Sequence, residues 1–68
     1  MKLKLMFCEE FSNNFKGTEY NISTFIDPQS LTIIYGSNVK SEKPFIKGEL
    51  YDCEVIVKNN KLKVTKVL

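Results

Sequence analysis

Residues 51–68, YDCEVIVKNNKLKVTKVL, decide the fold class of this chain. Apolar and polar residues alternate on both sides of the adjacent Asn59 and Asn60, a pattern typical of strands with one solvated face. Asparagine tolerates the positive φ angles of a two-residue type I′ turn, so the segment is predicted to form a hairpin. The pairs that follow are Val57–Leu62 and Val55–Val64, expected inside, and Ile56–Lys63 on the opposite face.

Three earlier segments alternate in the same way, and we predict strands at residues 2–8, 19–26 and 31–36. DPQS at 27–30 predicts a turn between the last two, because Pro28 presets φ at the second turn position. Residues 9–18, EEFSNNFKGT, show no sustained period, and we interpret them as a loop that carries Phe11 and Phe15. No segment has the period of an amphipathic helix.

The hairpin predicted at residues 19–36 has one face that is more apolar than the other. With a four-residue turn, Ile26 pairs with Leu31, and the more apolar face holds Ile22, Thr24, Ile26, Leu31, Ile33 and Tyr35. We expect this face to belong to the core. The opposite face, which carries Phe25 and Ile34, is then expected to lie on the outside.

Five strands with almost no helix predict an all-β fold, and 68 residues have room for a single small domain, residues 1–68. An open five-stranded sheet would leave two exposed edges, which a closed barrel removes. We therefore predict a small five-stranded β-barrel. The long segment after the first strand and the projecting last hairpin favour an OB-like layout, and an SH3-like barrel is the alternative.

The residue types present speak against catalysis and metal binding. The chain has no His, so it lacks a zinc-finger ligand set and any Cys–His or Ser–His pair. Its one adjacent carboxylate pair, Glu9 and Glu10, would point to opposite faces of a strand. Cys8 and Cys53 have no ligand spacing, and we predict two free, mostly buried thiols. We expect that the protein is not an enzyme and that it uses no metal or cofactor.

Charge is modest overall but uneven along the chain. Ten lysines and eight carboxylates give a net charge of +2. Seven of the lysines, with four acids, lie in residues 35–68. There is no Arg, which excludes bidentate reading of guanine, whereas Lys suits phosphate contact without sequence reading.

The chain shows no sequence signal for a membrane or for export. No apolar run approaches the ~20 residues of a membrane span, and the start lacks the apolar stretch of a signal peptide. The composition is rich in Lys, Asn, Ile and Phe, with no Ala, Arg, His or Trp, which is typical of an AT-rich genome. We expect a cytoplasmic protein of a bacterium or of its phage.

The surface chemistry predicts a binding site. On an OB-like barrel the ligand lies across strands two and three, between the loop after strand one and the last hairpin. Aromatic rings stack on bases and cations contact phosphates, and together they bind single strands with little sequence preference. The candidate nucleic-acid-binding residues in these elements are Phe15, Lys16, Asn21, Phe25, Ile34, Lys58, Lys61 and Lys63. We therefore predict non-catalytic binding of single-stranded nucleic acid, with ssDNA as the expected ligand.

FKGTEYNISTFIDPQSLTIIYG at 15–36 and FIKGELYDCEVIVKNNKLKVTKVL at 45–68 resemble the small OB-fold single-stranded DNA-binding proteins of phages and mobile elements. The resemblance is one of layout, and it implies DNA binding. The alternative is a phage or mobile-element protein-interaction module that binds a host protein, since exposed apolar residues mark protein contact as readily as stacking. A chain this small also gains buried area by self-association, so a homodimer is a further candidate assembly.

Overall fold

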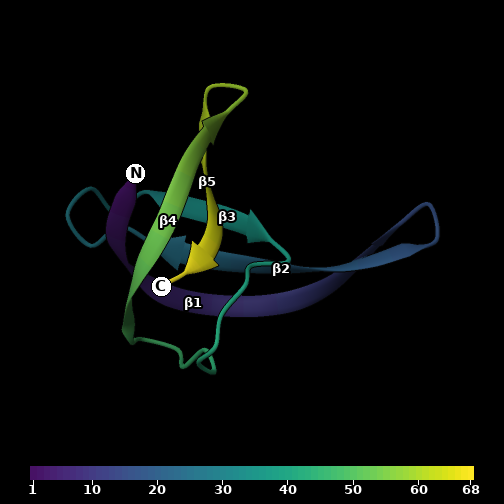
Figure 1. Cartoon of the computed structure of the whole chain (residues 1–68), viewed down its shortest axis with the longest axis horizontal. Coiled ribbons are helices and arrows are strands. Elements are labelled where there is room, and N and C mark those ends of the chain that lie inside the picture. The colour runs from purple at the N-terminus through teal and green to yellow at the C-terminus, as the bar shows by residue number, and fades with distance from the viewer.

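In a computed structural model that describes all 68 residues, the chain consists of five strands joined by turns and loops (Figure 1). The strands are β1 (Lys2–Phe15), β2 (Thr18–Ile26), β3 (Ile33–Ser37), β4 (Leu50–Lys58) and β5 (Lys61–Val67). They close into a barrel in the order β1-β2-β3-β5-β4. The predicted all-β, five-stranded barrel is confirmed. No helix is present, and hence none that is long and apolar enough to cross a membrane.

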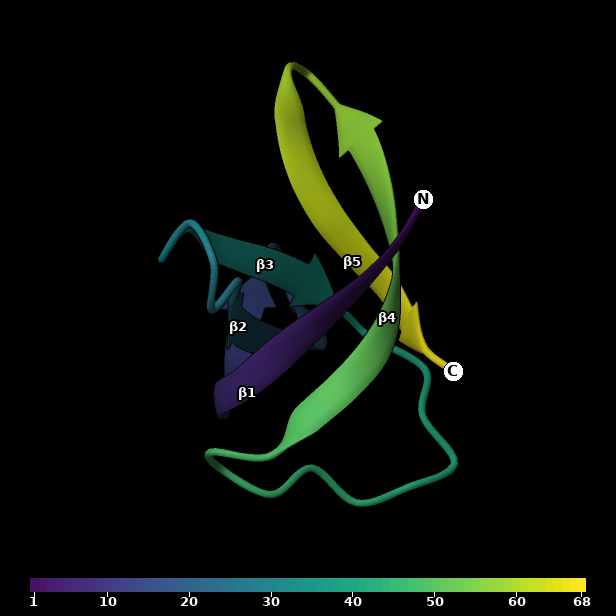
Figure 2. The ribbon, with the colours of Figure 1, turned by 90° about the vertical axis from the view of Figure 1, so that its left-hand side faces the viewer.

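One parallel strand pair sets the topology. β5 runs beside β3 in the same direction, with Tyr35 opposite Lys63, whereas the other strand pairs are antiparallel. The last hairpin therefore closes the barrel by pairing β5 with β3 and β4 with β1, so that β5 lies between β3 and β4 (Figure 2). The closed five-stranded barrel is consistent with the OB-like layout and with the SH3-like alternative.

The closing hairpin has the register predicted from the sequence. Asn59 and Asn60 both have positive φ angles, 53° and 63°, as a type I′ turn requires. The cross-strand pairs are Lys58–Lys61, Val57–Leu62, Ile56–Lys63 and Val55–Val64. Val55 and Val64 are fully buried, but Val57 is 62% exposed because the hairpin projects beyond the barrel.

The predicted loop at residues 9–18 is instead the projecting part of a long hairpin (Figure 1). β1 continues to Phe15, and β2 begins at Thr18. The turn between them consists of Lys16 and Gly17, which both have positive φ angles of 53° and 80°. The loop prediction is therefore wrong, although Phe15 does lie near the tip of a projecting element.

A β-bulge explains why the alternation in this hairpin is hard to recognise. The register of β1 against β2 shifts between Phe7 and Glu9, which leaves Cys8 as an extra residue. Leu5 and Phe7 point into the core before the bulge, and after it the odd-numbered residues point outward. A two-residue period read across the bulge therefore fails. We call residues 9–24 the β1–β2 arm.

Aromatic rings fill the barrel. Phe25 is fully buried and makes edge-to-face contacts with Phe7, at 5.6 Å between ring centroids, and with Phe45, at 5.9 Å. Phe45 comes from the loop between β3 and β4 and stacks on Phe7 at 4.8 Å. Tyr51 holds this loop, because its hydroxyl accepts a hydrogen bond from the Ile46 amide. The cluster thus closes one end of the core.

The prediction that Phe25 and Ile34 lie on the outside is wrong. Their exposed fractions are 0% and 2%, and the face predicted to be core is the outer one. Counting apolar residues selects the wrong face, because the inside of so narrow a barrel is limited by space. Ser23 and Gly36 lie on the inner face and let the strands approach closely. A Cβ on Gly36 would lie only 2.6 Å from the Val64 carbonyl oxygen.

The loop between β2 and β3 is longer than predicted, which shifts the pairing by two residues. Ile26 pairs with Ile33 rather than with Leu31. The Asp27 amide donates to the Thr32 carbonyl, and the Leu31 amide donates to the Asp27 carbonyl, so the loop is closed by its own backbone. A shift of two leaves every residue on its face. The wrong pairing of Ile26 with Leu31 therefore does not account for the wrong choice of core face.

Both cysteines are free thiols, as predicted, with Cys53 fully buried and Cys8 half-buried at the bulge. Burial raises the pKa of the Cys53 thiol from its ordinary 9.0 to about 11, and the charge of Asp52 adds to the rise. The unfolded chain loses this proton from about pH 9, whereas the folded chain keeps it to about pH 11. Since the unfolded state then binds fewer protons, the free energy of unfolding should fall as pH rises between these values.

Urea unfolding at about pH 8 and about pH 10.5 measures this effect, because the interval covers most of the range in which only the unfolded thiol ionises. The wild type is expected to lose more stability over the interval than Cys53→Ala, which shares all the other titrating groups. Equal losses in the two proteins would show that the folded state does not keep the Cys53 thiol protonated.

Candidate nucleic-acid interface

Two hairpins project from the barrel and bound one side of it (Figure 1). The β1–β2 arm extends along the long dimension of the molecule, and the β4–β5 hairpin rises away from it (Figure 1). Each ends in a two-residue turn with positive φ angles. β2, β3 and β5 lie between the two tips and carry the surface on which a ligand of an OB-like barrel lies.

The strand register brings aromatic and apolar side chains to the outside of these strands. Directly opposed residues of neighbouring strands point to the same side. The outward pairs are Phe15–Thr18, Asn13–Tyr20, Phe11–Ile22 and Thr24–Tyr35, and β5 adds Lys63 beside Tyr35. The Asn13 side-chain amide donates to the Tyr20 hydroxyl, consistent with this arrangement. We call the surface formed by Phe11, Phe15, Tyr20, Ile22, Ile33, Tyr35 and Lys63 the outer face.

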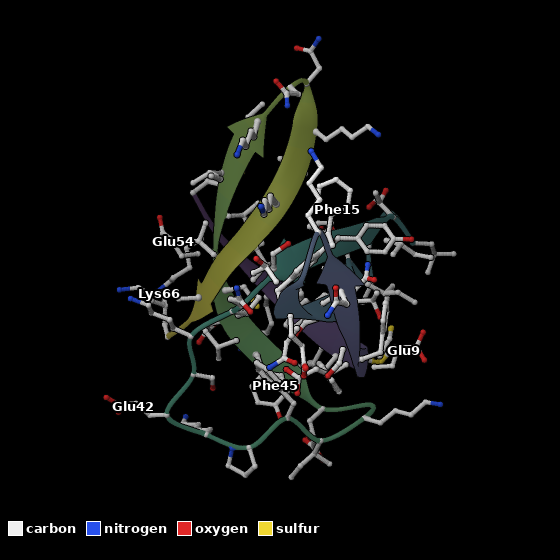
Figure 3. All side chains as sticks on the ribbon, turned by 90° about the vertical axis from the view of Figure 1, so that its right-hand side faces the viewer. Glu9, Phe15, Glu42, Phe45, Glu54 and Lys66 are labelled. Atoms are coloured by element: carbon white, nitrogen blue, oxygen red, sulfur yellow. The ribbon has the colours of Figure 1, made fainter.

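Phe15 stands at the end of the β1–β2 arm. Its ring is 61% exposed, and the Lys16 ammonium lies 5.3 Å from the ring centroid. Figure 3 shows Phe15 on the side of the arm from which the β4–β5 hairpin rises. An exposed ring beside a free cation can stack on a base while the cation contacts a phosphate.

Tyr35 lies at the foot of the β4–β5 hairpin and is 55% exposed. A hollow of about 430 Å³, which we call the Tyr35 hollow, is lined by Tyr35, Lys58, Asn59, Lys61, Leu62 and Lys63. Three lysines thus line the hollow together with one aromatic ring, and no carboxylate lines it. A ring among cations offers a stacking surface with phosphate contacts on its rim.

The charges of this hollow are not neutralised within the chain. The structure has two ion pairs, which join the Met1 ammonium to Glu54 and Lys4 to Asp52. Both lie away from the Tyr35 hollow, so its lysines are free to attract an external anion. Screening by salt weakens exposed charges of this kind, and any affinity they provide should depend on ionic strength.

The structure brings five of the eight predicted site residues to the two projecting tips and the surface between them. These are Phe15, Lys16, Lys58, Lys61 and Lys63. It does not bring Phe25 and Ile34 there, because both side chains belong to the core. The platform predicted on their face is therefore absent.

Asn21 lies on the opposite side of the β1–β2 arm. It pairs with Ser12, whose hydroxyl donates to the Asn21 side-chain oxygen. The Asn21 amide donates to the side-chain oxygen of Asn38. These contacts hold the base of the arm, and Asn21 is not part of the outer face.

Three aromatic residues of the outer face, Phe11, Tyr20 and Tyr35, are missing from the predicted site. The sequence does hold a signal for Tyr35. The central hairpin has apolar residues on both faces, and a barrel strand with only one buried face needs them on one. With Phe25 and Ile34 inside, the apolar residues of the other face, Tyr35 among them, lie on the surface. Such exposed apolar residues are what a binding surface requires.

The outer face has no chemistry for holding a metal. No group of three or more His, Cys, Asp and Glu side chains occurs anywhere in the structure. The arrangement of exposed rings and unpaired ammonium groups suits binding of a polyanion with flat, unpaired bases. Comparison with protein-family models, with curated proteins and with solved structures finds no match to this chain.

Proposed function

We propose that this protein binds single-stranded nucleic acid on its outer face, with ssDNA as the expected ligand. The observation that carries the proposal is the Tyr35 hollow, which an exposed ring lines together with Lys58, Lys61 and Lys63. A base can stack on the ring while its neighbouring phosphates meet the ammonium groups. The exposed ring of Phe15 offers a second stacking position at the other end of the face.

The chemistry favours a single strand over a duplex. Bases of a duplex are stacked on one another, so their faces are not available to Tyr35 or Phe15. The chain has no Arg to read guanine edges, and its lysines contact phosphates without sequence information. We therefore expect weak sequence preference and similar affinity for different single-stranded sequences.

A polarisation titration tests the proposal. Labelled single-stranded and duplex oligonucleotides of equal length are titrated at low and at physiological salt. Three lysine–phosphate contacts predict a slope of about −2 for log K against log salt on the single strand, from about 0.7 per contact. No binding of the single strand at low salt would refute the proposal.

Replacing Tyr35 with Ala is expected to weaken single-strand binding by about 5- to 150-fold, since one stacked base contributes roughly 1–3 kcal/mol. Tyr35→Phe keeps the ring and should bind almost as tightly as the wild type. Titration of the three proteins with the same oligonucleotide gives the comparison. Equal losses for Ala and Phe would show that the hydroxyl, and not the stacking surface, is what matters.

A protein-interaction module is the second candidate function, and one observation favours it. Phe11, Ile33 and Phe15 expose apolar side chains on one surface, which a protein partner or a second copy could cover. Salt distinguishes the two functions. An apolar protein interface should hold its affinity as salt rises, whereas binding through lysines should weaken steeply.

A further inference from the structure

A second basic hollow lies at the far end of β5, where the chain closes the barrel. It has a volume of about 380 Å³, and its lining includes Lys40, Lys43, Lys66 and Ser41. We call it the Lys66 hollow. In Figure 3, β5 runs from the hairpin tip down to the labelled Lys66, and the segment that carries Glu42 passes beside it. The two hollows thus lie at the two ends of β5.

A β-bulge places the lysines of β5 on one side. The pairing of β4 with β5 shifts after Val64, which pairs with Val55, so that Lys66 pairs with Glu54 and Thr65 is the extra residue. Without the bulge, alternation would turn Lys66 to the side opposite Lys63. With it, Val64 and Val67 both point inward, as their burial shows, and Lys66 points outward like Lys63.

Lys40 extends this row sideways. It forms an isolated parallel bridge with Lys66, whose flanking hydrogen bonds run from the Val67 amide to the Lys40 carbonyl and from the Lys40 amide to the Thr65 carbonyl. Val39, the preceding residue, packs against the core, so alternation turns Lys40 outward. Lys61, Lys63, Lys66 and Lys40 therefore form a continuous row on the outside of the barrel.

The acids near this row leave it positive. Glu54, the neighbour of Lys66 on β4, is paired with the Met1 ammonium at 3.6 Å. Glu42 also lines the Lys66 hollow, so its lining has three lysines and one carboxylate side chain. None of the three lysines is in an ion pair. The Lys66 hollow thus has a smaller positive excess than the Tyr35 hollow, which suits one or two phosphate contacts.

We infer that the Lys66 hollow is a second phosphate-binding site for the same nucleic-acid strand, which runs along β5 from the Tyr35 hollow. The inference rests on the proposed function and deepens it by extending the footprint beyond the outer face. The path from Lys61 to Lys66 is about 17 Å long at the usual rise per residue of a strand. Because the Lys66 hollow has no exposed aromatic ring, it contacts the backbone and adds affinity without adding stacking.

The test compares two oligothymidylates, about 4 and about 16 nucleotides long, which bracket the site sizes of single OB folds. Lys40→Gln/Lys66→Gln removes two charges from the row. Lys4→Gln/Lys47→Gln also removes two lysines and is the control, because Lys4 is already paired with Asp52 and Lys47 lies in the loop between β3 and β4. For the longer oligonucleotide, the first variant should have a salt slope shallower by about 1.4, which is twice 0.7, while the control keeps the wild-type slope. For the shorter one, all three proteins should bind alike.

Two results would overturn the inference, and they differ from each other. If the wild type binds both oligonucleotides and the two double variants behave alike on the longer one, the proposed function stands and the second site does not exist. If the wild type binds neither oligonucleotide at low salt, the proposed function fails and the second site falls with it. Unchanged melting temperatures of both variants show that the comparison reports binding and not folding.

Discussion

Val55→Asp is expected to unfold the protein. Val55 is fully buried opposite Val64, and its amide donates to the Met1 carbonyl at 2.7 Å. A carboxylate there has no partner, and burying it should cost on the order of 4–5 kcal/mol. A domain of 68 residues has a total stability of roughly 3–10 kcal/mol, so the loss removes most or all of it.

Val57→Asp is the matched control for this experiment. Val57 lies two residues further along β4, on the same side, but beyond the barrel. A carboxylate at this position stays in water, and we expect less than about 1 kcal/mol of change. Thermal unfolding followed by circular dichroism gives both values. Equal melting temperatures for the two variants would show that the hairpin does not enter the core as described.

Phe25→Ala is expected to destabilise the protein by about 3–5 kcal/mol. The ring contacts both Phe7 and Phe45 at the centre of the barrel, and its removal leaves a cavity that neighbouring strands cannot fill. Tyr35→Ala, on the outer side of the same hairpin, should change the melting temperature little. Urea unfolding of the two variants decides which face of the central hairpin is core. The account is wrong if Tyr35→Ala is the more destabilising of the two.

The elements that could be predicted from the sequence are those fixed by local chemistry. In the closing hairpin, two asparagines that tolerate positive φ determine the turn, and the turn determines the register of every pair behind it. The number of strands and the barrel class follow from alternation and from the need to cover sheet edges. Each of these signals lies within a few residues of the feature that it predicts.

The faces of the central hairpin could not be predicted, because they depend on the space inside the closed barrel. Both faces hold apolar residues, and only the approach of Gly36 to Val64 and the packing of Phe25 against Phe7 and Phe45 distinguish them. These contacts join residues that are distant in the sequence. The bulge at Cys8 conceals the β1–β2 arm for a different reason, since it shifts the alternation by one residue.

The residues of the candidate site also divide into those that the local sequence predicts and those that depend on the closed barrel. Phe15 and the lysines of the last hairpin belong to projecting tips, and tips are exposed whichever face of the barrel strands is core. The prediction that Tyr35 lies in the core with the rest of its face is wrong, because its side chain is 55% exposed. Tyr35, and not Phe25, is therefore the ring that lies with the lysines of the last hairpin.

Chemical-shift mapping by NMR tests the central claim most directly, because it shows both whether a single strand binds and where. A ¹⁵N-labelled sample is titrated with an oligothymidylate of about 16 nucleotides at low salt. The account predicts the largest shifts at Phe15, Tyr35, Lys61 and Lys63, and little change on the far side of the β1–β2 arm, at Ser12 and Asn21. Absence of shifts at saturating oligonucleotide, or shifts confined to the far side, would contradict it.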